Sequence, residues 1–368
     1  MSKNFTPHVA QDIALEDFMG IVDPEKLFAP NKQEIVADYR LLVKRFHPDV
    51  NDDPRAADAF RHAKTLCDRA LQKLENGTWE TPGVMRLRQK TGREATILYL
   101  KKRPFELGEM LICDGKLVFV VEKEFRDLAQ NAVHAMGAFP FANDAMRDQF
   151  APQLPVLEGT FQTDDGRTAV VVKRDNDLLL LQDVLEFMGG KIAPEHAAWI
   201  VSRLHNLACY FQWAGLVHND ISPMTVFIRP RDARAQGTAI GLNDHSAALL
   251  GGWWYAVKEN EPYIGLPNRT LDAMPRAAFN DPMPKAAFKT DQTLLRMVGR
   301  EIMGDPTGVH LVREKGVPKA MADWLMLPGS GDAFQDFSMW QSSVLKKSFG
   351  GRHFVAWDIK PHAVYPQP

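Results

Sequence analysis

The chain has 368 residues, of which 45% are hydrophobic and 24% are charged, with 44 basic and 46 acidic side chains. This composition is typical of a globular protein and excludes disordered, fibrous and collagen-like chains. The formal net charge of −2 argues against nucleic acid as a partner, because nucleic-acid-binding domains are usually strongly basic. At about 150 residues per domain, the length predicts two or three domains.

Cysteine usage and hydropathy indicate a cytoplasmic protein. Cys67, Cys113 and Cys209 are far apart and form no C-x-x-C pair, so neither a zinc ribbon nor a disulfide framework is expected. The polar N-terminal residues do not resemble a secretory signal. The longest apolar stretch, residues 246–257, is too short and too interrupted by glycine to cross a bilayer. We therefore expect a soluble, cytoplasmic protein with no membrane partner.

The first 80 residues predict two amphipathic helices that form an antiparallel hairpin. In the first helix, apolar residues recur at helical spacing at Ile35, Tyr39, Leu42 and Phe46. Asn31 is a suitable N-cap for this helix, and Pro48 must end it because its ring disfavours helical geometry at the preceding residue. The second helix is expected over about residues 54–75.

The loop of this hairpin contains the tripeptide His47-Pro48-Asp49, directly after a cationic helix end. In this context the segment of residues 14–80 resembles the J domain of DnaJ-type co-chaperones. The resemblance implies a DnaK-type chaperone as partner, and these residues as its binding site: Arg40, Lys44, Arg45, His47, Pro48 and Asp49. The alternative is a plain helix hairpin in which proline only ends a helix. The glycine-rich and cysteine-rich parts of DnaJ are absent, so client binding by those modules is not implied.

From about residue 96 the pattern changes to short β-strands. They are expected at residues 97–100, 110–113, 117–122, 156–161 and 168–172. Residues 125–150 are expected to be helical with a break at Gly137 and Pro140, and Asp164-Asp165-Gly166 predicts a hairpin turn.

After Pro194 the pattern is mostly helical. One long helix is expected to end at Gly215 and another to cover about residues 290–303, with short strands at 226–228 and 239–242. The aromatic residues 253–255 are expected to pack in the core. The last residues, from Pro361, are expected to form a frayed tail.

Four features in chain order, between residues 94 and 357, resemble the protein-kinase fold. The segment LVHNDISPMTVFI resembles a catalytic loop, with Asp220 at the place of the catalytic aspartate. Lys123 ends the strand KLVFVVEK, at the place of the phosphate-pairing lysine, and Asp244 stands at the place of the metal-binding aspartate. Asp291 would be the buried carboxylate of a helix that anchors the catalytic loop.

The two resemblances together imply an α+β protein. A small all-α J-domain hairpin would precede a bilobal kinase-like fold with a β-rich N-terminal lobe and an α-rich C-terminal lobe. ATP and Mg²⁺ are the implied cofactors. Asp220 would accept the proton of the attacking hydroxyl, as phosphoryl transfer requires. The implied ligands of nucleotide and metal are Lys123 with Asp144 or Asp148, and Asp244 with Thr225.

Several residues depart from the kinase pattern. Thr225 stands where the second metal-binding asparagine is expected, and Ser222 stands where the loop lysine is expected. No G-x-G-x-x-G loop occurs, and no A-P-E triplet closes the activation segment. Lys123 is equally consistent with a solvated lysine at a strand end. Asp220 is the strongest catalytic candidate, and a loop cap is its alternative role. His218 is expected in the core.

Two functions therefore remain open. In the first, the protein is a J-domain co-chaperone that stimulates the ATPase of a DnaK-type chaperone, and its kinase-like domain is a scaffold or nucleotide sensor. In the second, it is an atypical Ser/Thr kinase that is recruited to chaperone or client proteins. The intact His47-Pro48-Asp49 loop favours the first, whereas the retained Lys123, Asp220 and Asp244 favour the second.

Overall fold

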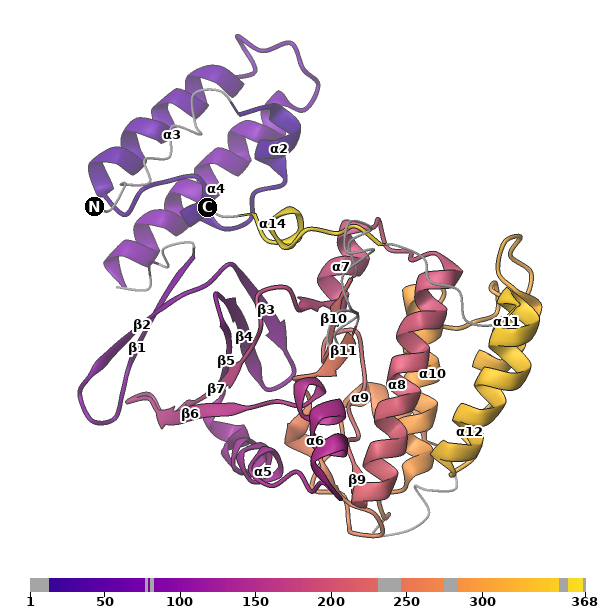
Figure 1. The fold of residues 1–368 in the computed structure, drawn as a ribbon. Helices are drawn as coiled ribbons and strands as arrows, with labels where there is room; N and C mark the ends of the chain where they lie inside the picture. The colour runs from indigo at the N-terminus through magenta and orange to yellow at the C-terminus, as the bar shows by residue number, and fades with distance from the viewer. Residues whose placement is uncertain are drawn as a thin grey trace. The chain divides into compact units, whose positions relative to one another are not determined.

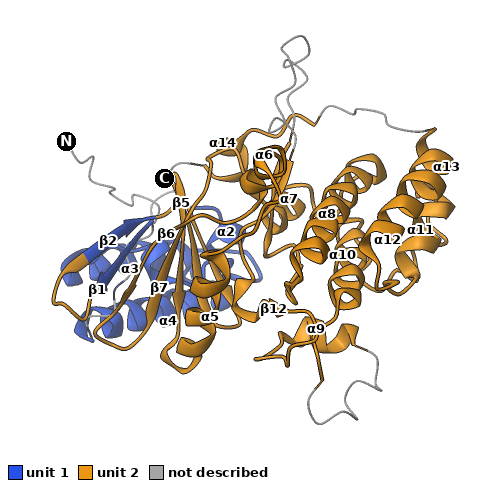
Figure 2. Ribbon diagram, turned by 60° about the horizontal axis from the view of Figure 1, so that its bottom comes forward, with its two compact units in different colours: residues 1–87, 95–98 blue, residues 88–94, 99–368 orange. Residues whose placement is uncertain are grey.

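A computed structural model describes residues 13–76, 79, 83–230, 246–274, 284–350 and 357–366. The chain divides into two compact units, residues 1–87 with 95–98 and residues 88–94 with 99–368 (Figure 2). Helices dominate the first unit, and a five-stranded sheet is followed by helices in the second. The prediction of an α+β protein is confirmed at this level.

The first unit is built around a helix hairpin (Figure 1). Its helical segments are α2 (Leu15–Met19), η1 (Pro24–Lys26), α3 (Lys32–Phe46) and α4 (Ala56–Glu75). Helix α3 packs along α4, and Ile35, Leu42 and Phe46 are buried in the core of the unit. The Asn31 side chain accepts hydrogen bonds from the backbone N–H groups of Gln33 (2.8 Å) and Glu34 (3.4 Å), so the predicted N-cap is confirmed.

A two-stranded hairpin of β1 (Val84–Arg88) and β2 (Glu94–Leu98) follows, and the division between the units falls within it. The second unit then begins with an antiparallel sheet in the order β3-β4-β5-β7-β6. Its strands are β3 (Lys101–Phe105), β4 (Gly108–Cys113), β5 (Lys116–Val121), β6 (Leu157–Gln162) and β7 (Thr168–Lys173). Pro104 lies on β3, an edge strand, where a missing backbone donor is tolerated.

Between β5 and β6 the chain forms η2 (Lys123–Phe125), α5 (Arg126–Met136), α6 (Asp144–Phe150) and η3 (Ala151–Gln153). The predicted break between two helical stretches is therefore confirmed. Helix α5 packs against β7 and against η5 (Trp253–Tyr255). The Asn131 side chain donates hydrogen bonds to the carbonyl oxygens of Trp254 (3.1 Å) and Ala256 (2.9 Å), which ties α5 to that segment.

The remainder of the second unit is mostly helical. Its helices are α7 (Leu181–Phe187), α8 (Pro194–Ala214), α9 (Asn268–Ala273), α10 (Phe288–Ile302), α11 (Lys319–Met326), α12 (Ala333–Met339), η7 (Trp340–Leu345), α13 (Lys346–Phe349) and α14 (Pro361–Val364). Short strands connect them: β8 (Leu179–Leu180), β9 (Leu216–Val217), β10 (Val226–Arg229), β11 (Ser246–Leu249) and β12 (Val257–Lys258). Helices α8 and α10 pack against each other at the centre (Figure 1). Pro194 begins α8 and Gly215, with φ of 68°, ends it, as predicted.

The expectation of a frayed C-terminal tail is wrong for residues 361–366, the part of that tail which the structure describes. Val364 and Tyr365 are buried in the main core of the second unit. The Tyr365 hydroxyl accepts a hydrogen bond from the backbone N–H of Leu180 at 3.0 Å. Pro361 starts a helical turn that places these apolar side chains inward, so the segment belongs to the fold.

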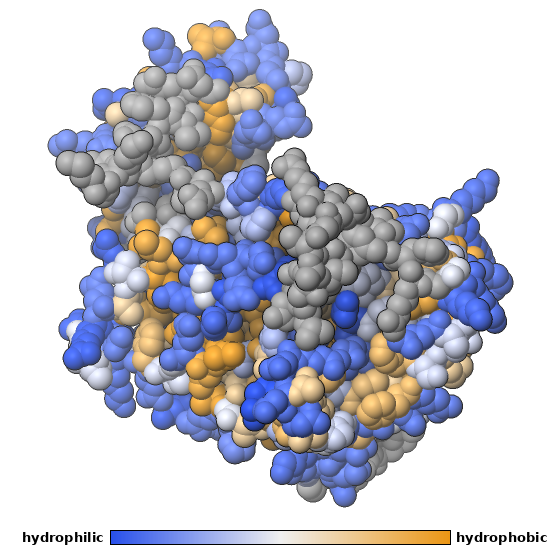
Figure 3. All heavy atoms as spheres, in the orientation of Figure 1, coloured by the Kyte–Doolittle hydropathy of each residue, from blue (hydrophilic) through white to orange (hydrophobic). Residues whose placement is uncertain are grey.

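The surface and the helices of the described residues can be compared with the expectation that the protein has no membrane partner. Hydrophilic residues predominate on the face drawn in Figure 3, and hydrophobic residues gather there in separate patches. Among the residues that the structure describes, no helix is long and apolar enough to span a membrane.

Candidate functional site

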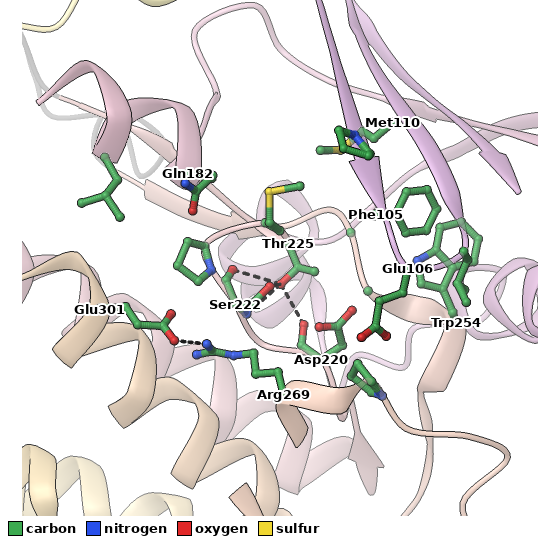
Figure 4. A pocket seen from close by; sticks show the side chains of 18 of the residues that line it. Phe105, Glu106, Met110, Gln182, Asp220, Ser222, Thr225, Trp254, Arg269 and Glu301 are labelled. Carbon is green, nitrogen blue, oxygen red and sulfur yellow. Dashed lines mark hydrogen bonds and ion pairs between the residues drawn. The ribbon is translucent and has the colours of Figure 1, made fainter. Parts of the chain in front are cut away.

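The second unit contains a cavity of about 590 Å³ between its five-stranded sheet and its helical part. Phe105, Met110 and Phe119 form the wall on the side of the sheet. The opposite side includes the loop after β9, with Asp220 and Thr225 (Figure 4). The cavity therefore lies where the kinase resemblance placed its catalytic loop.

This loop is held from below by Asp291, a buried residue of α10. The two carboxylate oxygens of Asp291 accept hydrogen bonds from the backbone N–H groups of His218 (2.7 Å) and Asn219 (2.8 Å). Asn219 has a φ of 66°, a left-handed conformation that asparagine tolerates better than most residues. Burial raises the pKa of Asp291 to about 7, against the effect of the two amides. The predicted role of Asp291 as a loop anchor is confirmed.

His218 is a structural residue of the loop. Its Nδ1 accepts a hydrogen bond from the backbone N–H of Asp220 at 3.2 Å, so the ring proton lies on Nε2 and is donated to the Gly251 carbonyl at 3.0 Å. Burial lowers the pKa of His218 to about 3, so the ring is neutral. The expectation that His218 lies in the core is confirmed.

Two glycines, Gly251 and Gly252, pack against the Asp220 loop. Gly252 has a φ of 82°, and a Cβ atom there would lie 2.5 Å from His218 Cε1 and 2.8 Å from the Asp220 carbonyl oxygen. A Cβ at Gly251 would lie 3.3 Å from Thr225 Cα. The loop and the segment after β11 therefore approach more closely at Gly252 than any side chain would allow.

Asp220 contributes one of the carboxylates that line the cavity. Its half-buried side chain forms no hydrogen bond or ion pair with any residue that the structure describes. Burial raises the pKa of Asp220 to about 8; Arg269 opposes this rise, and the carboxylates of Glu106 and Asp291 add to it. A partly buried carboxyl that lines a cavity and has a strongly shifted pKa is a candidate ligand-binding group.

Thr225 lines the cavity, but its hydroxyl is used by the loop itself. The hydroxyl donates a hydrogen bond to the Asp220 carbonyl at 2.7 Å and accepts one from the Ser222 N–H at 2.9 Å. These bonds fix the loop conformation and leave one lone pair of the Thr225 oxygen for any other partner. Thr225 thus acts as a positioning residue, and the described geometry gives no sign of metal ligation.

The structure does not bring the predicted nucleotide-binding residues into the cavity. Lys123 is exposed just beyond the end of β5, beside Gly166 of the β6–β7 turn, whereas Phe119 is the residue of β5 that lines the cavity. Asp144 and Asp148 are exposed on α6, where Asp144 forms an ion pair with Arg147 at 2.9 Å. Asp144 and Asp148 lie further along the chain than predicted, because a separate helix, α5, comes between β5 and α6.

Asp244, the predicted metal ligand, lies outside the described residues. Strand β11 pairs with β10 in a register that sets Leu249 opposite Val226 and Ser246 opposite Arg229. The chain that leaves β11 beside the Asp220 loop is therefore Leu250-Gly251-Gly252, which carries no carboxylate. Among the described residues, no group of three His, Cys, Asp or Glu side chains could hold a metal ion.

Sequence reasoning missed three charged residues of the cavity. Glu106, in the β3–β4 turn at the mouth of the cavity, accepts hydrogen bonds from the Asn268 N–H (3.1 Å) and the Tyr255 hydroxyl (3.4 Å). Arg269 and Glu301 form an ion pair with each other. Trp253, Trp254 and Tyr255 are all buried in the core as expected, and Trp254 and Tyr255 also line the cavity. No motif marks these positions, since they come from a turn and from two helices.

The described lining does not fit Mg²⁺ and ATP, because no group of three His, Cys, Asp or Glu side chains among the described residues could hold the metal and because the one guanidinium of the lining is paired. Phosphate groups need cationic side chains or metal ligands around them. The described lining holds three carboxylates, Glu106, Asp220 and Glu301, and one guanidinium, Arg269, which is paired with Glu301. We therefore derive no phosphoryl-transfer step from this cavity.

In the first unit, the residues predicted to bind a chaperone lie on and after α3. Asp49 donates its backbone N–H to His47 Nδ1 at 3.2 Å, and the His47 ring packs edge-on against Phe60 with centroids 5.3 Å apart. Pro48 and Asp49 are exposed. The side chains of Arg40, Lys44 and Arg45 are exposed on α3.

Comparison with known proteins adds no relative. No model of a known protein family matches this chain, and no curated protein sequence matches it. The function must therefore be argued from the residues of the two units.

Proposed function

We propose that the protein is a J-domain-type co-chaperone that docks on a DnaK-type chaperone and stimulates its ATPase. The observation that carries this proposal is the His47-Pro48-Asp49 loop, which joins two packed antiparallel helices and remains accessible. The exposed side-chain fraction is 40% for His47 and 83% for Asp49.

The conformation of this loop is restrained before any partner binds. Pro48 restricts its own φ, the N–H of Asp49 is bound to the His47 ring, and that ring rests on Phe60. Restraint of this kind lowers the entropic cost of binding, because fewer torsions are frozen in the complex. A plain connection between helices would need neither the ring contact nor the exposed polar groups.

The exposed cations of α3 define the chemistry of the partner surface. Arg40 and Lys44 are four residues apart and so lie on one side of the helix, and Arg45 is next to Lys44. Such a group accelerates association with an acidic surface, and its contribution decreases as salt screens the charges. The proposed partner therefore presents an acidic surface to α3.

Steady-state ATP hydrolysis by a purified DnaK-type chaperone tests this function. The full chain should raise the rate, and His47→Gln should abolish the increase while circular dichroism shows an unchanged fold. Lys64→Ala, which removes an exposed cation from α4, is the matched control and should stimulate like the wild type. Equal stimulation by wild type and His47→Gln would show the co-chaperone proposal to be wrong.

The second unit is proposed to bind a ligand rather than to transfer phosphate. Of the residues implied for nucleotide, metal and catalysis, the described cavity contains only Asp220 and Thr225. The atypical-kinase alternative keeps one observation in its favour, the anchored loop that directs Asp220 toward the cavity. Incubation with γ-labelled ATP and Mg²⁺ separates the two: label that disappears in Asp220→Ala supports the kinase, and no label in either protein supports the binding unit.

A further inference from the structure

We infer that the cavity of the second unit binds a small organic cation, an amine whose charged nitrogen lies between Glu106 and Asp220 and whose apolar body lies against Phe105 and Trp254. This inference deepens the proposed ligand-binding role of that unit. It is independent of the co-chaperone loop, which lies in the first unit.

The charge balance of the lining is the first argument. The only guanidinium of the described lining, Arg269, is already paired with Glu301. Among the described residues, neither Glu106 nor Asp220 forms an ion pair, and the charge of Arg269, which acts on Asp220, is shared with Glu301. Figure 4 shows Glu106 and Asp220 next to each other. A positive ligand would supply the missing counter-charge, whereas an anion would meet two carboxylates at close range.

The orientation of Glu106 is the second argument. The Asn268 N–H and the Tyr255 hydroxyl hold its carboxylate in one position, although the residue as a whole is exposed at the mouth. The backbone of Asp220 is fixed by the anchored loop, because its N–H donates to His218 Nδ1 and its carbonyl accepts from the Thr225 hydroxyl. One carboxylate held by hydrogen bonds and a second on a fixed backbone lower the entropic cost of binding.

The aromatic wall is the third argument, and it distinguishes an organic cation from a metal ion. Phe105 stacks on Trp254 with centroids 5.7 Å apart, and Phe119 meets Trp254 edge-on at 5.2 Å. Aromatic faces attract cations and offer apolar surface to the rest of an organic ligand. A bare metal ion would use none of this wall, and no group of three His, Cys, Asp or Glu side chains among the described residues is arranged to hold one.

The size of the cavity agrees with this ligand class. Its volume of about 590 Å³ falls within the range of small-molecule sites, roughly 300–1,000 Å³. A bicyclic amine therefore fits, with its ring system along the sheet wall and its nitrogen toward the Asp220 loop.

Three probes with the same ring and different charge test the inference: tryptamine (a cation), tryptophol (neutral) and indole-3-propionate (an anion). Their affinities for the full chain are measured by isothermal titration calorimetry at pH 8.5. We expect tryptamine to bind ~10-fold tighter than tryptophol, since each exposed or half-buried charge pair contributes up to about 1 kcal/mol. Indole-3-propionate should bind most weakly.

Variants locate the binding site. Glu106→Gln, at the cavity mouth, should weaken tryptamine ~3-fold, and the double variant Glu106→Gln/Asp220→Asn should bind tryptamine and tryptophol with equal affinity. Asp323→Asn, which removes an exposed carboxylate from α11, is the matched control and should behave like the wild type.

Four results would overturn the inference. They are equal binding of tryptamine and tryptophol by the wild type, tighter binding of the anion, no binding of any probe at millimolar concentration, and a preference for tryptamine that survives the double variant. Displacement of tryptamine by ATP with Mg²⁺ at lower concentration would also contradict the charge argument. Because His47→Gln should leave tryptamine binding unchanged, a failure here is distinguishable from a failure of the co-chaperone proposal.

Discussion

Replacement of Asp291 by alanine should destabilise the second unit and release the Asp220 loop. Each carboxylate oxygen of Asp291 accepts one backbone hydrogen bond, from His218 at 2.7 Å and from Asn219 at 2.8 Å. All three residues are buried, so water cannot replace the lost acceptor without opening the structure. The two N–H groups would therefore remain without partners in Asp291→Ala.

The expected loss of stability follows from these two bonds. A buried donor that loses its acceptor costs about 1–3 kcal/mol, so two donors cost about 2–6 kcal/mol. Removal of a buried carboxylate, whose pKa is raised to about 7 by burial, offsets part of this cost. We expect a net loss of about 2–4 kcal/mol, which corresponds to a decrease in Tm of ~5–15 °C for a unit of this size.

Urea unfolding followed by tryptophan fluorescence measures this loss selectively. All tryptophans except Trp79 lie in the second unit, so the signal reports mainly on that unit. Asp323→Ala, an exposed carboxylate of α11, is the control and should change the free energy of unfolding by less than about 1 kcal/mol. A wild-type midpoint for Asp291→Ala would refute the argument, because it would mean that the two amides do not depend on this carboxylate.

Three further predictions concern the same unit. Gly252→Ala should lower the free energy of unfolding by about 2 kcal/mol or more in urea titrations, because its Cβ would lie 2.5 Å from His218 Cε1 at a φ of 82°. Asp336→Ala should cost about 3–5 kcal/mol in the same assay, because it leaves Arg296, which is buried and 2.6 Å from Asp336, without its counter-charge. Tryptamine affinity should rise ~2–3-fold from pH 7 to pH 9, because Asp220, with a pKa raised to about 8 by burial, must ionise to attract the amine, whose own pKa lies near that of lysine, at ~10. A flat pH profile in calorimetry, or an equal rise in Asp220→Asn, would contradict this last prediction.

The helix hairpin of the first unit could be predicted because its signals are local. Asn31 caps α3 through its own side chain, and Pro48 ends the same helix by sterics within one residue. The apolar spacing of Ile35, Leu42 and Phe46 fixes which side of α3 is buried. None of these effects depends on residues far away in the chain, so a single sequence suffices to derive them.

Strand β3 could not be predicted, because its stability comes from distant residues. The sequence of Lys101–Phe105 has no apolar alternation and contains Pro104. In the structure, Arg103 Nε donates to Asp183 Oδ1 at 2.8 Å, and Lys101 Nζ lies 2.8 Å from the same oxygen of this buried carboxylate on α7. The pairing of these groups spans about 80 residues of chain, which no local pattern encodes.

Tyr365 illustrates the same limit at the other end of the chain. A Pro-rich, terminal segment is usually frayed, and the sequence offers no indication of a binding partner for it. The partner is the backbone N–H of Leu180, which the Tyr365 hydroxyl satisfies at 3.0 Å. Whether a terminal aromatic residue packs therefore depends on a site that only the folded unit creates.

For the cavity, sequence motifs located the loop but not its electrostatics. The resemblance to a kinase catalytic loop and to the helix that anchors it predicts Asp220 and Asp291, and hydrogen bonds join that helix to the loop in the structure. The metal position was assigned to Asp244 on the assumption of a strand at 239–242, which lies outside the described residues. The register of β10 with β11 brings Gly251 and Gly252 to the loop instead.

The chemistry of the cavity then follows from what surrounds Asp220. A catalytic aspartate in phosphoryl transfer needs cations nearby to hold the phosphates. Here Glu106 approaches from the β3–β4 turn and adds a negative charge, while Lys123 lies exposed beyond β5 and outside the described lining. The same loop geometry is therefore compatible with two different chemistries, phosphoryl transfer and cation binding. The sign of the charge on the residues around Asp220 decides between them. A sequence motif identifies the loop, whereas the charge around Asp220 is set by residues that the tertiary fold brings close to the loop.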